Sequence, residues 1–303
     1  MSSAEVFARG TACARAALAG NPSDRYGGAV LAVTVPALRA DAWVKGGTGA
    51  PRAVDPPSEL VEAAVRRFGR SFAEHAAKTA VRWQTSVPRG VGLGGSSAIV
   101  ISTLRALCEL HGVALTPAEL ASLALEVETE DLGIAAGLQD RVAQSYGGLT
   151  FMEFAPEPHY EPLSPRLLPP LLIAWRSDAA QESDDVHRSL RGRVGPRDDS
   201  VSKVMDELAK LARAARAALL ADDREQFAGA VDGSFDARRR LLALDERHVE
   251  MVEVARSLGA GANYTGSGGA IVATCRDDRH RKDISRGLRA VGCQTLEVQV
   301  EGD

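Results

Sequence analysis

The chain has 303 residues, of which 45% are hydrophobic and 25% are charged, and its formal net charge is −4. This length allows a substantial core in one large domain or two, and the composition is ordinary for a soluble globular protein. The slightly negative charge argues against nucleic acid and membrane surfaces as partners. With no apolar run of 18 residues and no signal peptide, we expect a cytoplasmic protein that is a monomer or a homodimer.

Apolar periodicity predicts strands intermixed with helices through the first half of the chain. The helix expected over 97–111 is apolar on nearly every face, which predicts burial on all sides. Thr116 precedes Pro117, which together form a typical helix start. The expected elements are strands over 29–36, 80–87 and 151–154, and helices over 60–77, over 97–111 and from 117 onward.

The second half begins after a proline-rich segment, residues 155–170, which favours a domain boundary. Strands and helices are again intermixed, which favours an α+β fold. The expected strands are 171–175, 270–275 and 295–300. The expected helices are 201–220 and 283–290, and helical patterns also continue from 220 through 258.

The most informative segment is Val87–Ile99, with the sequence VPRGVGLGGSSAI. Glycines let the backbone approach a ligand closely, and the start of the following helix attracts anions. A serine hydroxyl at such a helix start can also reach a magnesium ion held by phosphates. The segment therefore predicts a phosphate-binding loop and nucleotide-dependent phosphoryl transfer.

Three other kinds of glycine-rich loop share part of this sequence. The text GxGxxG fits a dinucleotide-binding turn, but no acidic residue stands about 20 positions further on. A classical P-loop would need a lysine before the serines, and none is present. A glycine-rich turn that merely begins a helix is the third interpretation.

Three further segments combine glycines with polar residues. Residues 260–270 precede a strand and indicate close backbone approach, although a tight turn would look the same. Residues 20–28 contain groups that can bind sugar hydroxyls, but Asn-Pro-Ser-Asp is also good turn chemistry. In residues 128–148, Asp140 can accept a hydroxyl proton or serve as a helix cap, and the acids around Glu128 can bind magnesium or form a solvated helix face.

Taken in order, these segments resemble the three motifs of the GHMP kinases, a family that includes galactokinases and mevalonate kinases. ARAALAGNPSDRYGG resembles the first motif, PRGVGLGGSSA the second and YTGSGGA the third. Within the family, the text GNPSDRYGG, LGIAAGLQDRVAQSYGGL and VHRSLRGR is very similar to that of glucuronokinases. The resemblance covers the motif regions and their spacing, and therefore most of the chain.

The resemblance implies the α+β fold of the GHMP kinases, with a ribosomal-S5-like N-terminal domain (1–162) and a ferredoxin-like C-terminal domain (163–303). It also implies ATP as phosphate donor and Mg²⁺ as metal. Ser96 would bind magnesium, with Ser97 as the alternative, together with Glu128, with Glu130 as the alternative. The residues implied at the ATP phosphates are Pro88, Gly90, Gly92, Leu93, Gly94, Gly95, Ser96 and Ser97.

For catalysis the resemblance implies Asp140, which takes or orients the proton of the acceptor hydroxyl, and Arg15 at the reacting end. Because arginine reads carboxylates through two hydrogen bonds, Arg141 and Arg25 are candidates for a uronate carboxylate. The residues implied at the substrate are Asn21, Asp24, Tyr26, Arg141, Gly266, Ser267 and Gly268.

The galactokinase text GEHTDY is replaced here by GNPSDRY, which argues against galactose as the acceptor. We therefore expect phosphorylation of a sugar or sugar acid at its anomeric hydroxyl, with D-glucuronate as the acceptor. The alternatives are a GHMP kinase for another sugar or small alcohol, a non-catalytic binding protein on the same scaffold and, more distantly, an NAD-dependent oxidoreductase.

Overall fold

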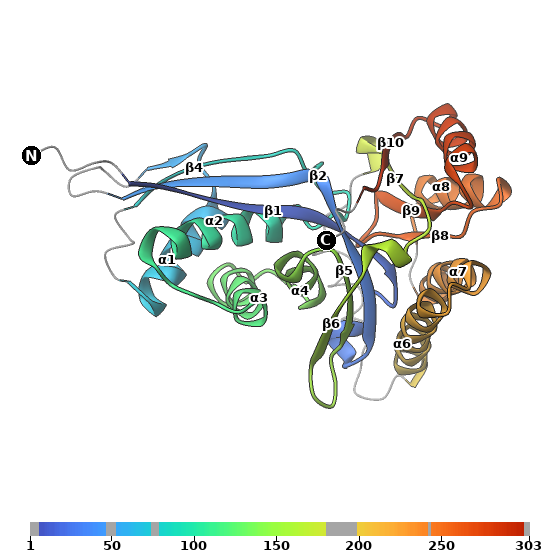
Figure 1. Ribbon diagram of the computed structural model, residues 1–303, viewed down its shortest axis with the longest axis horizontal. Helices are drawn as coiled ribbons and strands as arrows, with labels where there is room; N and C mark the ends of the chain where they lie inside the picture. The colour runs from blue at the N-terminus through green and yellow to red at the C-terminus, as the bar shows by residue number, and fades with distance from the viewer. Residues whose placement is uncertain (1–5, 47–52, 74–78, 180–198, 242–243, 300–303) are drawn as a thin grey trace, which may run out of the picture. The chain divides into compact units, whose positions relative to one another are not determined.

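The structure, a computed structural model, describes residues 6–46, 53–73, 79–179, 199–241 and 244–299. The chain divides into two compact units that are interleaved along the sequence (Figure 1). Unit 1 comprises 1–14, 38–87 and 94–146, and unit 2 comprises 15–37, 88–93 and 147–303. The expected domain boundary at 162/163 falls inside unit 2, so the compact units differ from the two expected domains, whose division stays a prediction.

The described residues of unit 1 form strands and four α-helices. Residues 40–45 of β2 pair antiparallel with 85–80 of β4, and β3 pairs parallel with β4. The bounds are β1 (Val6–Ala19), β2 (Ala29–Gly46), β3 (Val54–Asp55), β4 (Ala80–Thr85), α1 (Glu59–Ser71), α2 (Gly95–His111), α3 (Pro117–Glu126), a π-helical turn (Val127–Asp131) and α4 (Gln139–Tyr146); the later parts of β1 and the earlier part of β2 belong to unit 2.

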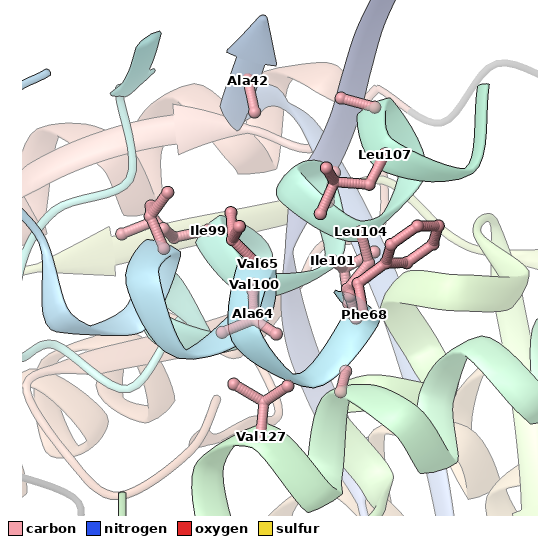
Figure 2. Packing of buried hydrophobic residues seen from close by; sticks show 14 of the residues in the cluster. Ala42, Ala64, Val65, Phe68, Ile99, Val100, Ile101, Leu104, Leu107 and Val127 are labelled. Atoms are coloured by element: carbon pink, nitrogen blue, oxygen red, sulfur yellow. The ribbon is translucent and has the colours of Figure 1, made fainter. Parts of the chain in front are cut away.

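Helix α2 lies at the centre of the unit 1 core. Its side chains from Ser97 to Leu104 are buried without interruption, which confirms the prediction of burial on all sides. Ile101, Leu104 and Leu107 lie near Phe68 of α1, and Ala42 of β2 belongs to the same cluster (Figure 2). Strand β1 also packs closely on α2, because a Cβ at Gly10 would overlap the carbonyl oxygen of Ser102. This core fixes where α2 begins.

Unit 2 contains two groups of paired strands. Residues 29–33 of β2 pair antiparallel with 153–149 of β5, which also pairs with β6. A separate four-stranded antiparallel sheet has the order β10-β7-β9-β8. The bounds are β5 (Leu149–Glu153), β6 (His159–Leu163), β7 (Leu171–Trp175), α6 (Asp199–Leu220), α7 (Arg224–Leu241), α8 (Glu246–Ser257), β8 (Ala262–Tyr264), β9 (Ala270–Thr274), α9 (Asp278–Ala290) and β10 (Gln294–Glu297), with short 3₁₀ turns at Ser23–Tyr26, Pro165–Leu167 and Ser177–Ala179.

The core of the four-stranded sheet joins strand residues such as Ile271 to Met251 and Val252 of α8 and to Ile284 and Leu288 of α9. Strands and helices are mixed in both units, which confirms the expected α+β class. In the part of the chain that the structure describes, no helix is both long and apolar enough to cross a bilayer.

Most expected elements are present with shifted ends. The strand over 171–175 has the expected bounds, and the capping pattern at Thr116 forms a complete capping box with Glu119. The proline-rich segment contains a strand that was not expected, because His159–Leu163 forms β6 against β5. Strand β1 was not expected at all. Part of the helix expected over 60–77 and the end of the strand expected over 295–300 lie outside the described residues.

Candidate functional site

The first half of the glycine loop, residues 88–93, belongs to unit 2 and packs against the glycine segment 265–269. Gly92 has φ +73°, and a Cβ on it would lie 2.9 Å from the carbonyl oxygen of Gly268. Thr265 Oγ1 donates to the carbonyl oxygen of Gly92 (3.1 Å), and a Cβ on Gly266 would overlap that same carbonyl. Two glycine segments far apart in sequence therefore support one another, and neither tolerates a side chain at the contact.

Arg15 ties these two segments together inside unit 2. Its side chain is buried, and Nη1 donates to the carbonyl oxygens of Gly92 (2.7 Å) and Thr265 (2.5 Å). Its backbone N–H donates to the carbonyl oxygen of Leu93 (3.0 Å). In this arrangement Arg15 positions both loops, and its expected contact with the reacting groups stays a prediction.

The second half of the loop, Gly94–Ser97, belongs to unit 1 and begins helix α2. Gly94 is the N-cap with φ +74°, and the first helical hydrogen bond runs from Ala98 N–H to its carbonyl oxygen (3.0 Å). Among the described residues no side chain caps this helix, and its first turn contains no carboxylate. The N–H groups of the first turn and the positive end of the helix dipole therefore suit an anion such as a phosphate.

The two serines of this turn differ in environment. Ser97 is buried, and its hydroxyl donates to the carbonyl oxygen of Gly94 (3.1 Å). Ser96 is exposed, so its hydroxyl is accessible to a ligand at the helix start. This difference favours Ser96 over Ser97 as the serine that meets a phosphate-bound metal.

Glu128 is fully buried in the π-helical turn of unit 1, which excludes the solvated helix face for this residue. Its Oε2 accepts from Arg141 Nε (2.6 Å) and Nη2, and Arg141 Nη1 donates to the carbonyl oxygen of Gly137 (2.8 Å). Glu128 Oε1 is buried and has no hydrogen-bond partner among the described residues. Burial raises the pKa of Glu128, and the guanidinium of Arg141 opposes this rise.

Glu130, the alternative magnesium ligand, has a different environment. Its side chain is 61% exposed and forms an ion pair with Arg67 (2.8 Å), which also contacts Glu126 and Asp131. For Glu130, the structure therefore agrees with the alternative interpretation, a solvated helix face. Mg²⁺ takes carboxylate oxygens as ligands, and Glu128 has one carboxylate oxygen without a partner among the described residues, whereas the Glu130 carboxylate is paired with Arg67.

Asp140 lies in the first turn of α4, with 18% of its side chain exposed. One turn later on the same helix, Gln144 Nε2 donates to the carbonyl oxygens of Gly94 (2.9 Å) and Cys13 (2.8 Å). Residues four apart on a helix share one face. The face of α4 that carries Asp140 is therefore hydrogen-bonded to the N-cap of α2, the residue where the phosphate-binding turn begins.

Arg105 holds the C-terminal end of α4, and neither Arg105 nor Gln144 was predicted from the sequence. Arg105 of α2 donates to the carbonyl oxygens of Gln144 (3.2 Å) and Ser145 (3.0 Å) through Nη2, and to that of Thr11 (2.6 Å) through Nη1. A cation is favourable at a helix C-terminus. Gln144 could have been found from its spacing to Asp140, whereas no local pattern distinguished Arg105.

The residues expected at the sugar lie in the 3₁₀ turn of unit 2 and just before it. Asn21 and Asp24 are buried, while Arg25 and Tyr26 are exposed. The amide of Asn21 already contacts protein groups, because Nδ2 donates to the carbonyl oxygen of Tyr264 (3.3 Å) and Oδ1 accepts from Asn263 (3.3 Å). Sugar contacts of these residues stay predictions.

Comparison with known proteins finds similarity to kinases. Residues 59–148 match the family "GHMP kinases N terminal domain". The chain is 39% identical over 213 residues to "Glucuronokinase 1" of Arabidopsis thaliana, covering 66% of this chain and 58% of that protein. It is 40% identical over 206 residues to "Probable glucuronokinase 2" of the same plant, covering 64% and 56% respectively. The chain thus spans little more than half the length of these relatives.

Solved structures share the fold over almost the whole chain. The L. major mevalonate kinase in complex with R-mevalonate superposes with a TM-score of 0.78 at 18% identity, covering 100% of this chain and 99% of that one. The Streptococcus pneumoniae phosphomevalonate kinase in complex with phosphomevalonate and AMPPNP gives 0.81 at 14% identity, covering 96% and 99%. These solved structures show that the chain has the fold of the GHMP kinases, and the family match over 59–148 and the curated relatives show that its sequence is similar to theirs.

Proposed function

We propose that this protein is a kinase that transfers the γ-phosphoryl group of ATP, with Mg²⁺, to the anomeric hydroxyl of D-glucuronate. The curated relatives named as glucuronokinases support the acceptor. The observation that carries the chemistry is the hydrogen bond from Gln144 to the carbonyl oxygen of Gly94. It joins the helix face of Asp140 to the turn suited to phosphates. We further propose that the enzyme works in the cytoplasm as a monomer or homodimer.

The described residues divide the work of phosphoryl transfer. Gly94, Gly95 and Ser96 bind the phosphates through the first turn of α2. Ser96 and Glu128 hold the magnesium ion, which when bound neutralises charge on the transferred phosphoryl group. The unpartnered Oε1 of Glu128 and the exposed hydroxyl of Ser96 fit that ion.

Asp140 acts on the acceptor. Its partly exposed carboxylate accepts the proton of the anomeric hydroxyl while the hydroxyl oxygen forms the new bond to phosphorus and ADP leaves. Arg141 Nη1 lies 3.8 Å from Asp140 Oδ2 and forms an ion pair with it.

A panel of acceptors tests the proposal. With ATP and Mg²⁺ present, the enzyme should have a higher kcat/KM for D-glucuronate than for D-galacturonate, D-galactose or mevalonate, measured as the release of ADP. ADP release can be followed by a coupled assay, with a reaction lacking acceptor as the control for ATP hydrolysis. No acceptor-dependent ADP release from D-glucuronate would overturn the proposed acceptor.

A second candidate within the family is a kinase for another phosphorylated or unphosphorylated sugar. It is favoured by the 38% identity over 96 residues to "D-glycero-alpha-D-manno-heptose 7-phosphate kinase" of Campylobacter jejuni, which covers 32% of this chain and 28% of that protein. The same panel, extended to heptoses and heptose phosphates, separates the two, because only one acceptor class should give efficient turnover.

A further inference from the structure

Arg238 stands at a core position of helix α7 in unit 2. The buried residues of this helix follow helical spacing, and Arg238 lies on that stripe four residues after Ser234. Only 2% of Arg238 is exposed. Arginine is almost never fully buried unless its charge is paired.

No described residue compensates this charge by hydrogen bonding. Nε and Nη1 of Arg238 are both buried and have no hydrogen-bond partner among the residues that the structure describes. The guanidinium lies over the ring of Tyr264, 5.3 Å from its centroid, and the buried hydroxyl of Tyr264 also lacks a described partner. Burial and, to a smaller extent, the positive charge of Arg15 lower the pKa of Arg238 to about 10, against an opposing effect of Tyr264.

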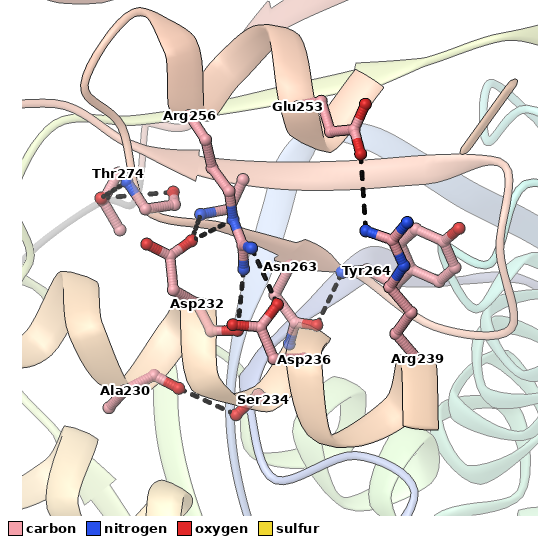
Figure 3. A network of polar contacts seen from close by, with 12 residues as sticks. Ala230, Asp232, Ser234, Asp236, Arg239, Glu253, Arg256, Asn263, Tyr264 and Thr274 are labelled. Atoms are coloured by element: carbon pink, nitrogen blue, oxygen red, sulfur yellow. Dashed lines mark hydrogen bonds and ion pairs between the residues drawn. The ribbon is translucent and has the colours of Figure 1, made fainter. Parts of the chain in front are cut away.

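The neighbouring arginine shows what an ordinary position on α7 looks like. Arg239 is 54% exposed and reaches Glu253 of α8 (3.4 Å), and Arg256 is paired with Asp232 and Asp236 of α7 (Figure 3). These ion pairs lie on the solvated side of the helix. Arg238 is thus set apart from Arg239 both by burial and by its lack of a carboxylate.

Arg238 lies near residues of the first and third motifs, both of which are in unit 2. Ser234, one turn earlier, accepts a hydrogen bond from the backbone N–H of Gly20 (3.3 Å), and Asn21 donates to the carbonyl oxygen of Tyr264. Tyr264 directly precedes Thr265, whose carbonyl oxygen is bound by Arg15. The first and third motifs therefore meet next to the unpartnered guanidinium.

The other arginines considered for a uronate are placed differently. Arg141 donates to Glu128 and Gly137, and Arg25 is exposed on a 3₁₀ turn. A ligand carboxylate would provide the negative charge that Arg238 lacks, and a guanidinium can bind it through two hydrogen bonds. We propose that Arg238 binds the carboxylate of an acidic sugar and so selects sugar acids over neutral sugars. This inference rests on the proposed function, whose acceptor it explains.

The test compares Arg238→Met with Arg239→Met, a matched control on the same helix. For Arg238→Met, the KM for D-glucuronate should rise at least about 30-fold, because truncating one partner of a buried charge pair has effects of this size. The KM for ATP should change less than about threefold. In Arg239→Met, the KM for D-glucuronate and the KM for ATP should both change less than about threefold. An unchanged KM for D-glucuronate overturns the inference, and a raised KM for ATP alone assigns Arg238 to a nucleotide phosphate instead.

Thermal unfolding without turnover separates ligand binding from a structural role. Because Arg238→Met removes an uncompensated buried charge, its ligand-free Tm should not fall, and D-glucuronate should raise the Tm of the wild type but not of the variant. An equal rise in Tm with D-glucuronate in both proteins contradicts the inference.

Arg238→Lys keeps the charge and covers the case in which the methionine variant does not fold. It should retain part of the affinity for D-glucuronate, because lysine lacks the planar fork, and wild-type affinity in this variant overturns the inference. If the wild type shows a Tm rise with D-glucuronate that depends on Arg238 but no turnover, the proposed function fails and this inference stands.

Discussion

Replacement of Asp140 by asparagine is expected to lower kcat with D-glucuronate by roughly 10²–10⁴-fold, because asparagine cannot take up the hydroxyl proton. Asparagine keeps the size and the hydrogen-bonding capacity of the side chain, so the fold of α4 and its contact with Gly94 through Gln144 should persist. The Kd for ATP, measured by equilibrium binding, should therefore stay within about threefold of the wild type.

Asp206→Asn is the matched control, because Asp206 is an exposed residue of α6. It should leave kcat and ATP binding unchanged. A nearly wild-type kcat for Asp140→Asn would remove Asp140 from proton transfer. A parallel loss of ATP affinity would show that the residue serves binding or folding instead.

Replacement of Arg141 by methionine is expected to destabilise the protein by roughly 3–5 kcal/mol at neutral pH, the usual cost of leaving one charge of a buried pair without its partner. Glu128 and Arg141 have side chains that are 1% and 6% exposed, so solvent screens this pair very little. Urea unfolding followed by circular dichroism measures the effect. Arg70→Met, which removes an ion pair of a 60% exposed arginine, should cost less than about 1 kcal/mol.

The same variant should also change the pH dependence of stability. Burial raises the pKa of Glu128 in the folded protein above its unfolded value of about 4.3, and loss of Arg141 removes the main opposing influence. The folded state then binds more protons than the unfolded state in the pH range above 4.3. The variant should therefore regain stability as the pH falls from 7 toward 5, and a deficit that is constant or grows over this range would contradict the account.

Much of the fold was predictable where apolar pattern and burial coincide. The continuous apolar runs of α2 and β7 gave correct elements, because residues buried on all sides need no amphipathic signal. Strand β1 was missed because its sequence, VFARGTACARAALA, is rich in alanine and interrupted by Gly10. That glycine is required by the close approach of α2, which is a tertiary contact.

The candidate site was predictable in composition more than in geometry. The motifs identified the glycine segments, Glu128 and Asp140, but not which oxygen of Glu128 pairs with Arg141 or how Gln144 reaches Gly94. Arg238 was hidden in a run of three arginines, 238–240, which reads as a solvated surface. Its helical register with Ser234 and Leu241 was the only local signal of burial.

A crystal structure of the complex with Mg²⁺, the ATP analogue AMPPNP and D-glucuronate tests the central claim most directly. We expect a triphosphate on the first turn of α2 and an Asp140 carboxylate oxygen within hydrogen-bond distance of the anomeric hydroxyl. A nucleotide bound away from Gly94–Ser97, or a sugar whose anomeric hydroxyl lies beyond the reach of Asp140, would contradict it.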